Sequence, residues 1–271
     1  MTTVTEPRVA SPAGQRRLWL RAFEYWAYQY KRTWTGNVVS TVLNPVVFLA
    51  AMGLGLGTLV DRSRPGGVDG VAYLVFLAPG LLAATAMQIG VAESTYPVMA
   101  SIKWIKTYLA MLSTPLGVSD VLFGHLLWIA VRVCSGCAVY LGVMAAFGAV
   151  RSPLALLAVP AALLTGLAFV APVMAYAASG ENDARFAALF RFVVTPLFLF
   201  SGTFFPISQL PWALEKLAYA TPLWHGVDLC RTLTLGTATA GMTAVHIAYL
   251  AACAGAGTWA AARAYRRALV V

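Results

Sequence analysis

Charged residues are scarce in this sequence. Asp, Glu, Lys and Arg make up 11% of its 271 residues, whereas 60% of the chain is hydrophobic. Soluble globular domains carry about 25% charged residues. Several of the apolar runs also exceed the roughly 20 residues that a helix needs to cross a hydrocarbon core of about 30 Å. The composition therefore excludes a soluble domain and predicts an all-α polytopic membrane protein.

The sequence also lacks the motifs of nucleotide hydrolysis. No Walker sequence occurs in it. The glycines of GLGLG (53–57) are followed by no Lys-Ser or Lys-Thr pair and preceded by no strand, both of which a phosphate-binding loop requires. Small residues instead allow helices to approach closely in lipid. We therefore expect helix packing at these glycines, and an energy source that lies outside this chain or in an ion gradient.

Metal ligands and catalytic groups are few and dispersed. Cys134 and Cys137 have the spacing of a redox or zinc site, but they lie in an apolar run without a second pair, which favours two small buried residues. The three histidines, His125, His225 and His246, are far apart in the sequence and form no His-x-x-x-His pattern. A membrane enzyme needs its reactive groups in one place. The sequence thus predicts no catalytic residue, no metal site and no cofactor in this chain.

The N-terminal region contains no secretory signal, because no short apolar core with a small-residue cleavage site follows its first basic residues. Residues 1–17 are rich in Pro, Thr and Ser, which predicts a disordered cytoplasmic arm. In residues 18–36, aromatic residues recur at helical spacing: Trp19, Phe23, Trp26 and Tyr30. That pattern is typical of an amphipathic helix in the membrane interface, and a cytosolic helix packed on a partner fits it too.

Six transmembrane helices are predicted within a domain of residues 37–262. They cover residues of about 38–60, 71–92, 121–150 and 153–179, a fifth run from about 192, and a last run of about 242–262. Residues 263–271 form a basic cytoplasmic tail.

The basic residues cluster on one side of these spans. They are concentrated in the N-terminal arm, in the tail and in two connectors, which carry Lys103, Lys106, Arg185 and Arg191. Positive residues favour the cytoplasmic side of a membrane. The sequence thus predicts a multi-pass protein with both termini in the cytoplasm, and topology rather than nucleic-acid binding explains the net charge of +9.

Four ionisable residues lie in or beside the spans: Glu93, Asp120, His125 and Arg132. Such residues are costly in a bilayer and point to function by default. His125, Trp128 and Arg132 share one helix face. Glu93 and Asp120 are candidates to pair with Arg132 or with the connector lysines. Two interpretations stay open: an anchor for the cytoplasmic half of the bundle, or a part of the transport path. His246 is predicted to be a hydrogen-bonded or interfacial histidine.

Residues 198–212 (FLFSGTFFPISQLPW) are as apolar as a span, yet a Ser-Gly pair and two prolines interrupt them. With the orientation above, the interruption lies near the outer surface, where non-helical backbone is tolerated if protein or water covers it. We expect a re-entrant segment of about 203–231 with short helices, which is either a gate for release or a packed cap. Its candidate residues are Gly202, Phe204, Phe205, Pro206, Leu210 and Pro211.

Two long motifs resemble one protein family. KTYLAMLSTPLGVSDVLFGHLLW (106–128) and LFSGTFFPISQLPWALEKLAYATPLWHGVDLCR (199–231) resemble the permease subunits of type 2 ATP-binding cassette exporters, in the nodulation protein J-like and drug-efflux branch. LAPGLLA (77–83) adds to this likeness, which covers nearly the whole chain beyond the N-terminal arm. His125 departs from the family pattern, in which the corresponding residue is often Glu.

The resemblance implies that residues of about 101–117 form a coupling helix in a groove of a cytosolic ATPase subunit. Its expected contact residues are Lys103, Trp104, Lys106, Tyr108, Met111, Leu112, Thr114 and Pro115. Two ATPase subunits, which bind ATP and Mg²⁺, and a second permease chain, identical or related, would complete the transporter in a bacterial cytoplasmic membrane. The helix in 18–36 is then a connecting helix beside the ATPase.

The resulting hypothesis is an exporter permease for an amphipathic substrate: a lipid-linked saccharide, a lipid or a hydrophobic drug. One alternative, a gradient-driven secondary transporter, predicts internal repeats and acidic residues at mid-membrane. A second alternative, a polytopic lipid-modifying enzyme, predicts clustered catalytic residues. The sequence shows none of these patterns.

Overall fold

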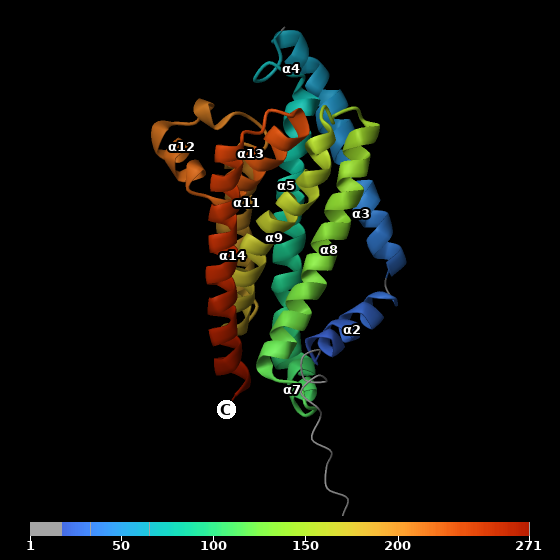
Figure 1. Cartoon of the computed structure of the whole chain (residues 1–271), viewed down its shortest axis with the longest axis vertical. Coiled ribbons are helices and arrows are strands. Elements are labelled where there is room, and N and C mark those ends of the chain that lie inside the picture. Colours follow the sequence, from blue (N-terminus) through green and yellow to red (C-terminus); the bar gives the residue numbers. More distant parts are fainter. Residues whose placement is uncertain (1–17, 33, 65, 271) are drawn as a thin grey trace, which may run out of the picture.

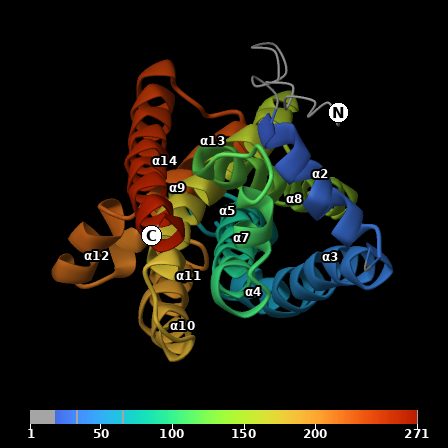
Figure 2. The same ribbon diagram turned by 90° about the horizontal axis from the view of Figure 1, so that it is seen from below.

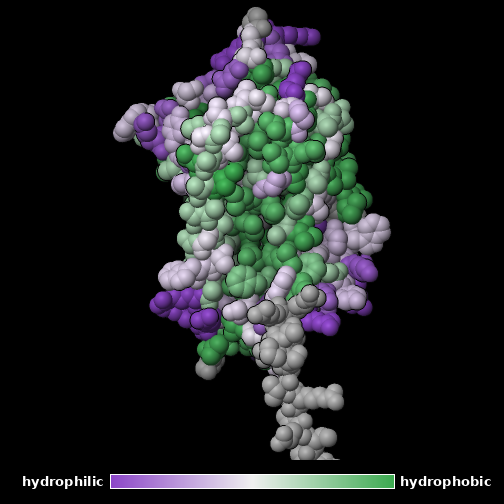
Figure 3. Space-filling model, viewed as in Figure 1, coloured by the Kyte–Doolittle hydropathy of each residue, from purple (hydrophilic) through white to green (hydrophobic). Residues whose placement is uncertain are grey.

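The computed structural model describes residues 18–32, 34–64 and 66–270, so the predicted disorder of residues 1–17 lies outside the described residues. Within these ranges the chain is helical, and its only β-type pairing is an isolated bridge between Val68 and Val71. The helices form an elongated bundle (Figure 1). Its surface is apolar over the middle and hydrophilic at both ends (Figure 3). The predicted all-α class and multi-pass character are confirmed.

Five helical stretches in the described residues are long and apolar enough to cross a membrane: Thr41–Ser63, Tyr73–Trp104, Val118–Ala146, Pro153–Ala178 and Ala240–Leu269. The first contains most of α3 (Trp34–Phe48), the π-helix η1 (Leu49–Leu56) and α4 (Gly57–Ser63). The third is α8 (Val118–Ala146), the fourth joins η3 (Pro153–Leu157) to α9 (Ala158–Ala178), and the fifth is α14 (Ala240–Leu269).

The predicted fifth run coincides with a shorter helix. It consists of α10 (Ala184–Leu189), η4 (Phe190–Val194) and α11 (Thr195–Phe200). At 1.5 Å per residue it is about 26 Å long, slightly less than a hydrocarbon core. A count of six spans therefore stays a prediction.

Helix α5 (Tyr73–Ser94) lies at the centre of the bundle, packed against α8, α9 and α13 (Figure 2). Small residues permit this packing, since a Cβ atom on Gly90 would lie 2.7 Å from Val170 Cγ2 and 3.3 Å from the Gly166 carbonyl oxygen. The glycines of residues 53–57 act similarly in part: Gly53 and Gly57 are buried, and Gly53 packs on Leu74 of α5.

The second span is longer than the sequence predicts. After a bend at Thr95 the helical path continues through α6 (Tyr96–Met99) and η2 (Ala100–Trp104), instead of ending near residue 92. Pro97 is compatible with this path because it occupies the first turn of α6, where no backbone N–H is needed. Lys106 then adopts a left-handed conformation (φ 59°, ψ 29°), and α7 (Thr107–Leu112) follows it. The predicted coupling segment is thus a helix end, a corner and one short helix.

Helix α2 (Leu18–Tyr30) lies across the lower part of α8 (Figure 1). Its aromatic stripe faces α8, and Ala22 and Trp26 are buried there. Contact is close because Gly124 of α8 has no side chain: a Cβ atom at this position would lie 2.5 Å from Ala22 Cβ and 2.6 Å from the Trp19 carbonyl oxygen. The amphipathic helix predicted in 18–36 therefore exists, but it ends at Tyr30.

The interrupted segment forms a helical hairpin at the end of the bundle opposite α2 and α7 (Figure 1). After α11, Gly202 takes a left-handed backbone conformation (φ 79°). The short η5 (Ile207–Gln209), α12 (Trp212–Tyr219) and α13 (Pro222–Leu235) follow. The predicted sequence of a helix end, a turn and short helices is confirmed, with α13 extending to Leu235. Its insertion into a membrane stays a prediction.

Candidate functional site

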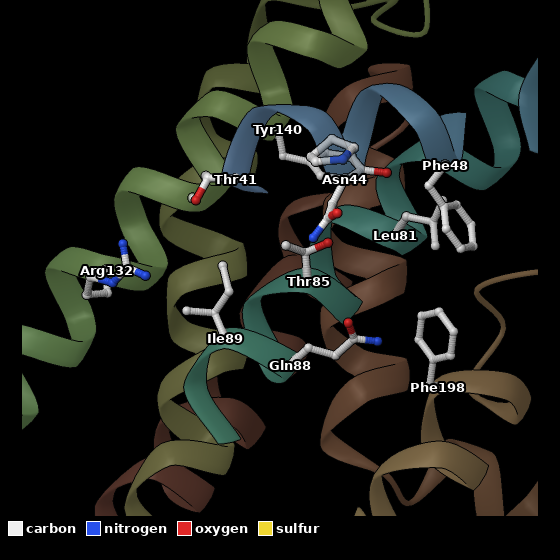
Figure 4. Close-up of a pocket in the computed structure, with 12 residues that line it drawn as sticks. Thr41, Asn44, Phe48, Leu81, Thr85, Gln88, Ile89, Arg132, Tyr140 and Phe198 are labelled. Carbon is white, nitrogen blue, oxygen red and sulfur yellow. The ribbon is translucent and has the colours of Figure 1, made fainter. Parts of the chain in front are cut away.

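A pocket of about 390 Å³ opens between α3, α5, α8 and α11. Its polar lining residues come from three helices: Thr41, Asn44, Thr85, Gln88, Arg132 and Tyr140 (Figure 4). Thr41 and Asn44 are three residues apart in sequence, as are Thr85 and Gln88, and this spacing places each pair on one helix face. The pocket therefore combines hydroxyl and amide groups with the apolar walls of a membrane bundle.

Tyr140 contributes a hydroxyl that has no hydrogen-bond partner in the described part of the chain, although its side chain is only 2% exposed. A buried hydroxyl without a partner is unfavourable by roughly 1–3 kcal/mol in proteins. Because this oxygen is enclosed by protein, Tyr140 borders the pocket without offering it an accessible hydroxyl.

The cation of the pocket is already neutralised. Arg132 Nε lies 3.1 Å from Glu93 Oε1, and Arg132 Nη1 donates to the Tyr30 hydroxyl at 2.9 Å. The side chains of Arg132 and Glu93 are 16% and 24% exposed. The predicted pairing of Glu93 with Arg132 is confirmed. Since the pair carries no net charge, the pocket favours an uncharged polar group over an anion.

The predicted shared face of His125, Trp128 and Arg132 lies against α2. His125 is buried and stacks on Trp26, with ring centroids 4.0 Å apart. Trp128 contacts the ring of Tyr30, which also lies beneath the Arg132 guanidinium. This arrangement supports the anchoring interpretation for His125 and Trp128, whereas Arg132 both anchors α2 and lines the pocket.

No ion pair in the described residues includes Asp120, so it pairs neither with Arg132 nor with the connector lysines. Its carboxylate instead accepts a hydrogen bond from the Gly117 backbone N–H at 3.0 Å, and so caps the start of α8. The proposed pairing was wrong because the helix terminus supplies a nearer donor.

The residues of the predicted coupling segment, about 101–117, divide into an exposed group and a group that faces the bundle. Exposed side chains are Lys103, Trp104, Lys106, Thr114 and Pro115, and half-buried ones are Met111 and Leu112. Tyr108 is fully buried, contacts His125 and lies 3.2 Å from the Tyr265 hydroxyl of α14. Burial raises the pKa of Tyr108, so it stays a neutral hydrogen-bonding group. In this structure Tyr108 fixes α7 to the bundle and offers no outward contact.

The hairpin is attached to α5 by Arg231. Its Nη2 donates to the Gly202 carbonyl at 2.7 Å and its Nε to the Phe76 carbonyl at 3.2 Å, while the guanidinium lies 3.9 Å from the Phe76 ring centroid. Phe76 lies three residues before Pro79, which lacks the N–H that would bond the Val75 carbonyl. Burial lowers the pKa of Arg231 to about 10, so the side chain remains charged at neutral pH.

Among the predicted gate residues, Phe204 packs on two aromatic residues of the pocket lining. Its ring packs against Phe48 and Phe198, with centroids 6.3 and 5.0 Å away. Gly202 is buried at the reversal and Phe205 is half-buried. Pro206 precedes η5, and Leu210 and Pro211 lead into α12. The ring of Phe204 therefore connects the hairpin to the pocket lining.

Two of the three histidines are neighbours in space, contrary to the sequence prediction. His225 Nδ1 of α13 and His246 Nδ1 of α14 are 2.8 Å apart, and His246 Nε2 lies 3.0 Å from Asp228 Oδ2. The separation in sequence was misleading because the hairpin folds α13 onto α14. His246 is buried and hydrogen-bonded, as predicted. The searched residues contain no group of three or more His, Cys, Asp or Glu arranged for a metal ion.

Comparison with known proteins assigns the chain to a family. The family model for ABC-2 type transporters matches residues 17–235, which include the pocket, the connector and the hairpin. The chain belongs to the ABC-2 type transporter family. It is 34% identical to nodulation protein J of Rhizobium leguminosarum bv. viciae over 240 residues, covering 88% of this chain and 90% of that protein.

Two further relatives of this ABC-2 type transporter are also nodulation J proteins. Nodulation protein J of Rhizobium meliloti (strain 1021) is 32% identical over 81% of this chain and 80% of its own length. That of Bradyrhizobium diazoefficiens is 30% identical over 93% of both chains. The family resemblance that the two motifs indicate is confirmed.

Neither the charged residues nor the motifs of the sequence predicted the polar pocket. A signal was present: Asn44 and Gln88 are amides within apolar runs, each with a threonine three residues before it. Uncharged polar residues inside a span also require a partner or a ligand.

Proposed function

We propose that this chain is the membrane-spanning permease subunit of an ABC exporter that moves an amphipathic substrate across the cytoplasmic membrane. A separate nucleotide-binding subunit hydrolyses the ATP and holds its Mg²⁺. The observation that carries this proposal is the ABC-2 family match over residues 17–235, which spans both the pocket and the exposed connector. Six spans, counting α10 to α11, and cytoplasmic termini belong to the same proposal.

The end of the connector supports docking of an ATPase subunit. Trp104, Ile105 and Leu109 are exposed apolar side chains at the hydrophilic end of the bundle, beside Lys103 and Lys106. Exposed apolar groups rimmed by polar ones mark sites of protein contact. Tyr108 holds this surface rigidly on the bundle, so displacement of the ATPase can be passed to α8 and α14 through packed contacts. Two such ATPase subunits and a second permease chain complete the proposed assembly.

The docking proposal is tested by Leu109→Asp. A charge on this exposed residue should abolish binding of the ATP-binding cassette subunit, because burial of an unpaired carboxylate at an interface is strongly unfavourable. Both chains are co-reconstituted in proteoliposomes, and complex formation and ATP hydrolysis are measured. Leu156→Asp is the matched control, since Leu156 is also exposed but lies in η3 at the other end of the bundle. An intact complex with normal ATP hydrolysis in Leu109→Asp would rule out this docking surface.

The pocket proposal is tested by Asn44→Leu combined with Gln88→Leu. These changes remove two amides while keeping similar volume, so export should lose about tenfold in kcat/KM if each amide contributes a net hydrogen bond of about 0.7 kcal/mol. Uptake of candidate lipids, lipid-linked saccharides and hydrophobic drugs into inverted vesicles is measured. Thr58→Leu serves as the control, because Thr58 is exposed near the end of the same span and outside the pocket. ATP-independent uptake driven by an ion gradient would favour a secondary transporter instead.

A further inference from the structure

A second site is formed by arginines at the end of the bundle that carries the C-terminus. The last turns of α14, the end of α9 and the start of α10 border two adjoining, open hollows of about 370 and 320 Å³. We call this the arginine groove. It is lined by Tyr176, Ser179, Arg185, Trp259, Arg263, Arg266 and Arg267. Residues 259, 263 and 267 are spaced by four and thus lie along one face of α14.

Within the described residues, the four arginines of the groove, Arg185, Arg263, Arg266 and Arg267, form no ion pair. No Asp or Glu lines either hollow, although Glu181 and Asp183 belong to the nearby connector. Each hollow is lined by three of these guanidinium groups, which favours an anionic ligand, and guanidinium matches phosphate oxygens in geometry.

Aromatic side chains place the groove at the depth of lipid headgroups. Trp259 is 68% exposed, and its ring lies 5.9 Å from the Arg263 guanidinium. The Arg185 guanidinium lies 3.7 Å above the Tyr176 ring. Exposed Trp and Tyr rings with neighbouring Arg are typical of the membrane–water interface. Figure 3 shows hydrophilic atoms below the apolar surface, on the side where Figure 1 places the last turns of α14.

The position on α14 favours a lipid over a protein ligand. Only 17% of the apolar window of α14 is buried inside the chain, and Val245 and Ile247 are exposed apolar side chains further along this helix. A ligand with a phosphate group and long apolar chains matches both parts, since the phosphate meets the arginines while the chains lie along α14. Basic hollows between transmembrane helices on the cytoplasmic side are suited to such headgroups.

We propose that the arginine groove binds the headgroup of an anionic phospholipid, with Arg263 and Arg267 as its principal phosphate contacts. The orientation in the proposed function places this end of the bundle on the cytoplasmic side, so the bound lipid belongs to the inner leaflet. The binding itself requires neither transport nor an ATPase, so its failure and the failure of the exporter proposal are distinguishable.

The test compares phospholipids with identical acyl chains. The purified full-length chain in detergent is titrated with dioleoyl phosphatidylglycerol or with dioleoyl phosphatidylcholine, and bound lipid is counted by native mass spectrometry. We expect the anionic lipid to bind at least tenfold more tightly. Arg263→Gln with Arg267→Gln should weaken it about 30-fold, as expected for the loss of two arginine–phosphate contacts, and should leave phosphatidylcholine binding unchanged.

Arg62→Gln with Arg64→Gln is the matched control, since both arginines are exposed at the opposite end of the bundle. If the groove double variant does not elute as a single species, Arg267→Gln alone replaces it, with a loss of about fivefold. Equal binding of the two lipids, or unchanged binding in the groove variant, overturns the proposal. Glycerol phosphate that competes as well as the lipid would identify a free-phosphate site instead. Loss of ATPase-subunit binding with phosphatidylglycerol binding intact would assign the groove to the protein partner.

Discussion

Replacing Gly124 with leucine will detach α2 from α8. Even the first side-chain atom at this position would lie 2.5 Å from Ala22 Cβ, 2.6 Å from the Trp19 carbonyl oxygen and 3.0 Å from the Phe23 backbone nitrogen. Two of these three atoms belong to the backbone, so no rotamer change relieves the clash. Overpacking typically costs about 1–3 kcal/mol where side chains can adjust, and more is expected where backbone must move.

Hydrogen exchange measures this detachment. In the native arrangement the amides of 18–30 are protected by a docked helix, whereas an isolated helix of 13 residues is marginal in water. The protection of 18–30 should therefore fall by at least tenfold in Gly124→Leu. Gly142→Leu is the matched control, because Gly142 lies on the same helix and a Cβ atom there meets nothing within 4 Å. Equal protection of α2 in both variants would show that the close contact is not required.

Breaking the ion pair of Glu93 and Arg132 is expected to have the second large effect. Glu93→Gln leaves the Arg132 guanidinium, only 16% exposed, without its carboxylate. Removal of one partner from a buried pair typically costs about 3–5 kcal/mol, because the remaining charge stays desolvated. The double change Glu93→Arg with Arg132→Glu restores opposite charges at the same two positions and should recover much of the loss.

The apparent unfolding temperature of the detergent-purified chain reports this effect. Glu24→Gln provides the control, since Glu24 and Arg21 also form a pair at 3.0 Å, but with side chains 49% and 73% exposed. Exposed pairs contribute about 0–1 kcal/mol. A Glu93→Gln variant as stable as Glu24→Gln, or a charge swap no better than the single change, would contradict a stabilising role for this pair.

Hydropathy predicts where apolar helices occur, but not what surrounds them. The segment 96–104 (YPVMASIKW) contains a lysine and a proline, which argued for a connector in the sequence. In the fold it continues the α5 path because Val98, Met99 and Ile102 are buried against protein rather than lipid. Protein packing can support a helix that is too polar to span a bilayer alone, and a single sequence contains no direct measure of that packing.

Contacts between segments far apart in the chain are the second feature that the sequence alone predicts poorly. The pairing of Glu93 with Arg132 was predictable, since few opposite charges exist near the spans. The approach of His225 to His246 was not, because it depends on how the hairpin folds α13 back along α14. The family motif predicts an outward role for Tyr108, whereas the fold turns it towards Tyr265, 157 positions further along the chain. Composition and motifs determined the class and the family, and tertiary packing determined the direction of each side chain.

Helices α5 and α14 both have the length and composition of a membrane span, yet different media surround them. Protein covers 78% of the apolar window around α5, but only 17% of that of α14. A protein interior is close-packed, so a side chain of the wrong volume strains its neighbours. On the outward face of α14, the described residues supply no such fixed neighbours. Natural variation should therefore exchange Leu, Phe and Val freely on α14 while preserving side-chain volume on α5, so that two helices of membrane-spanning length evolve under different rules.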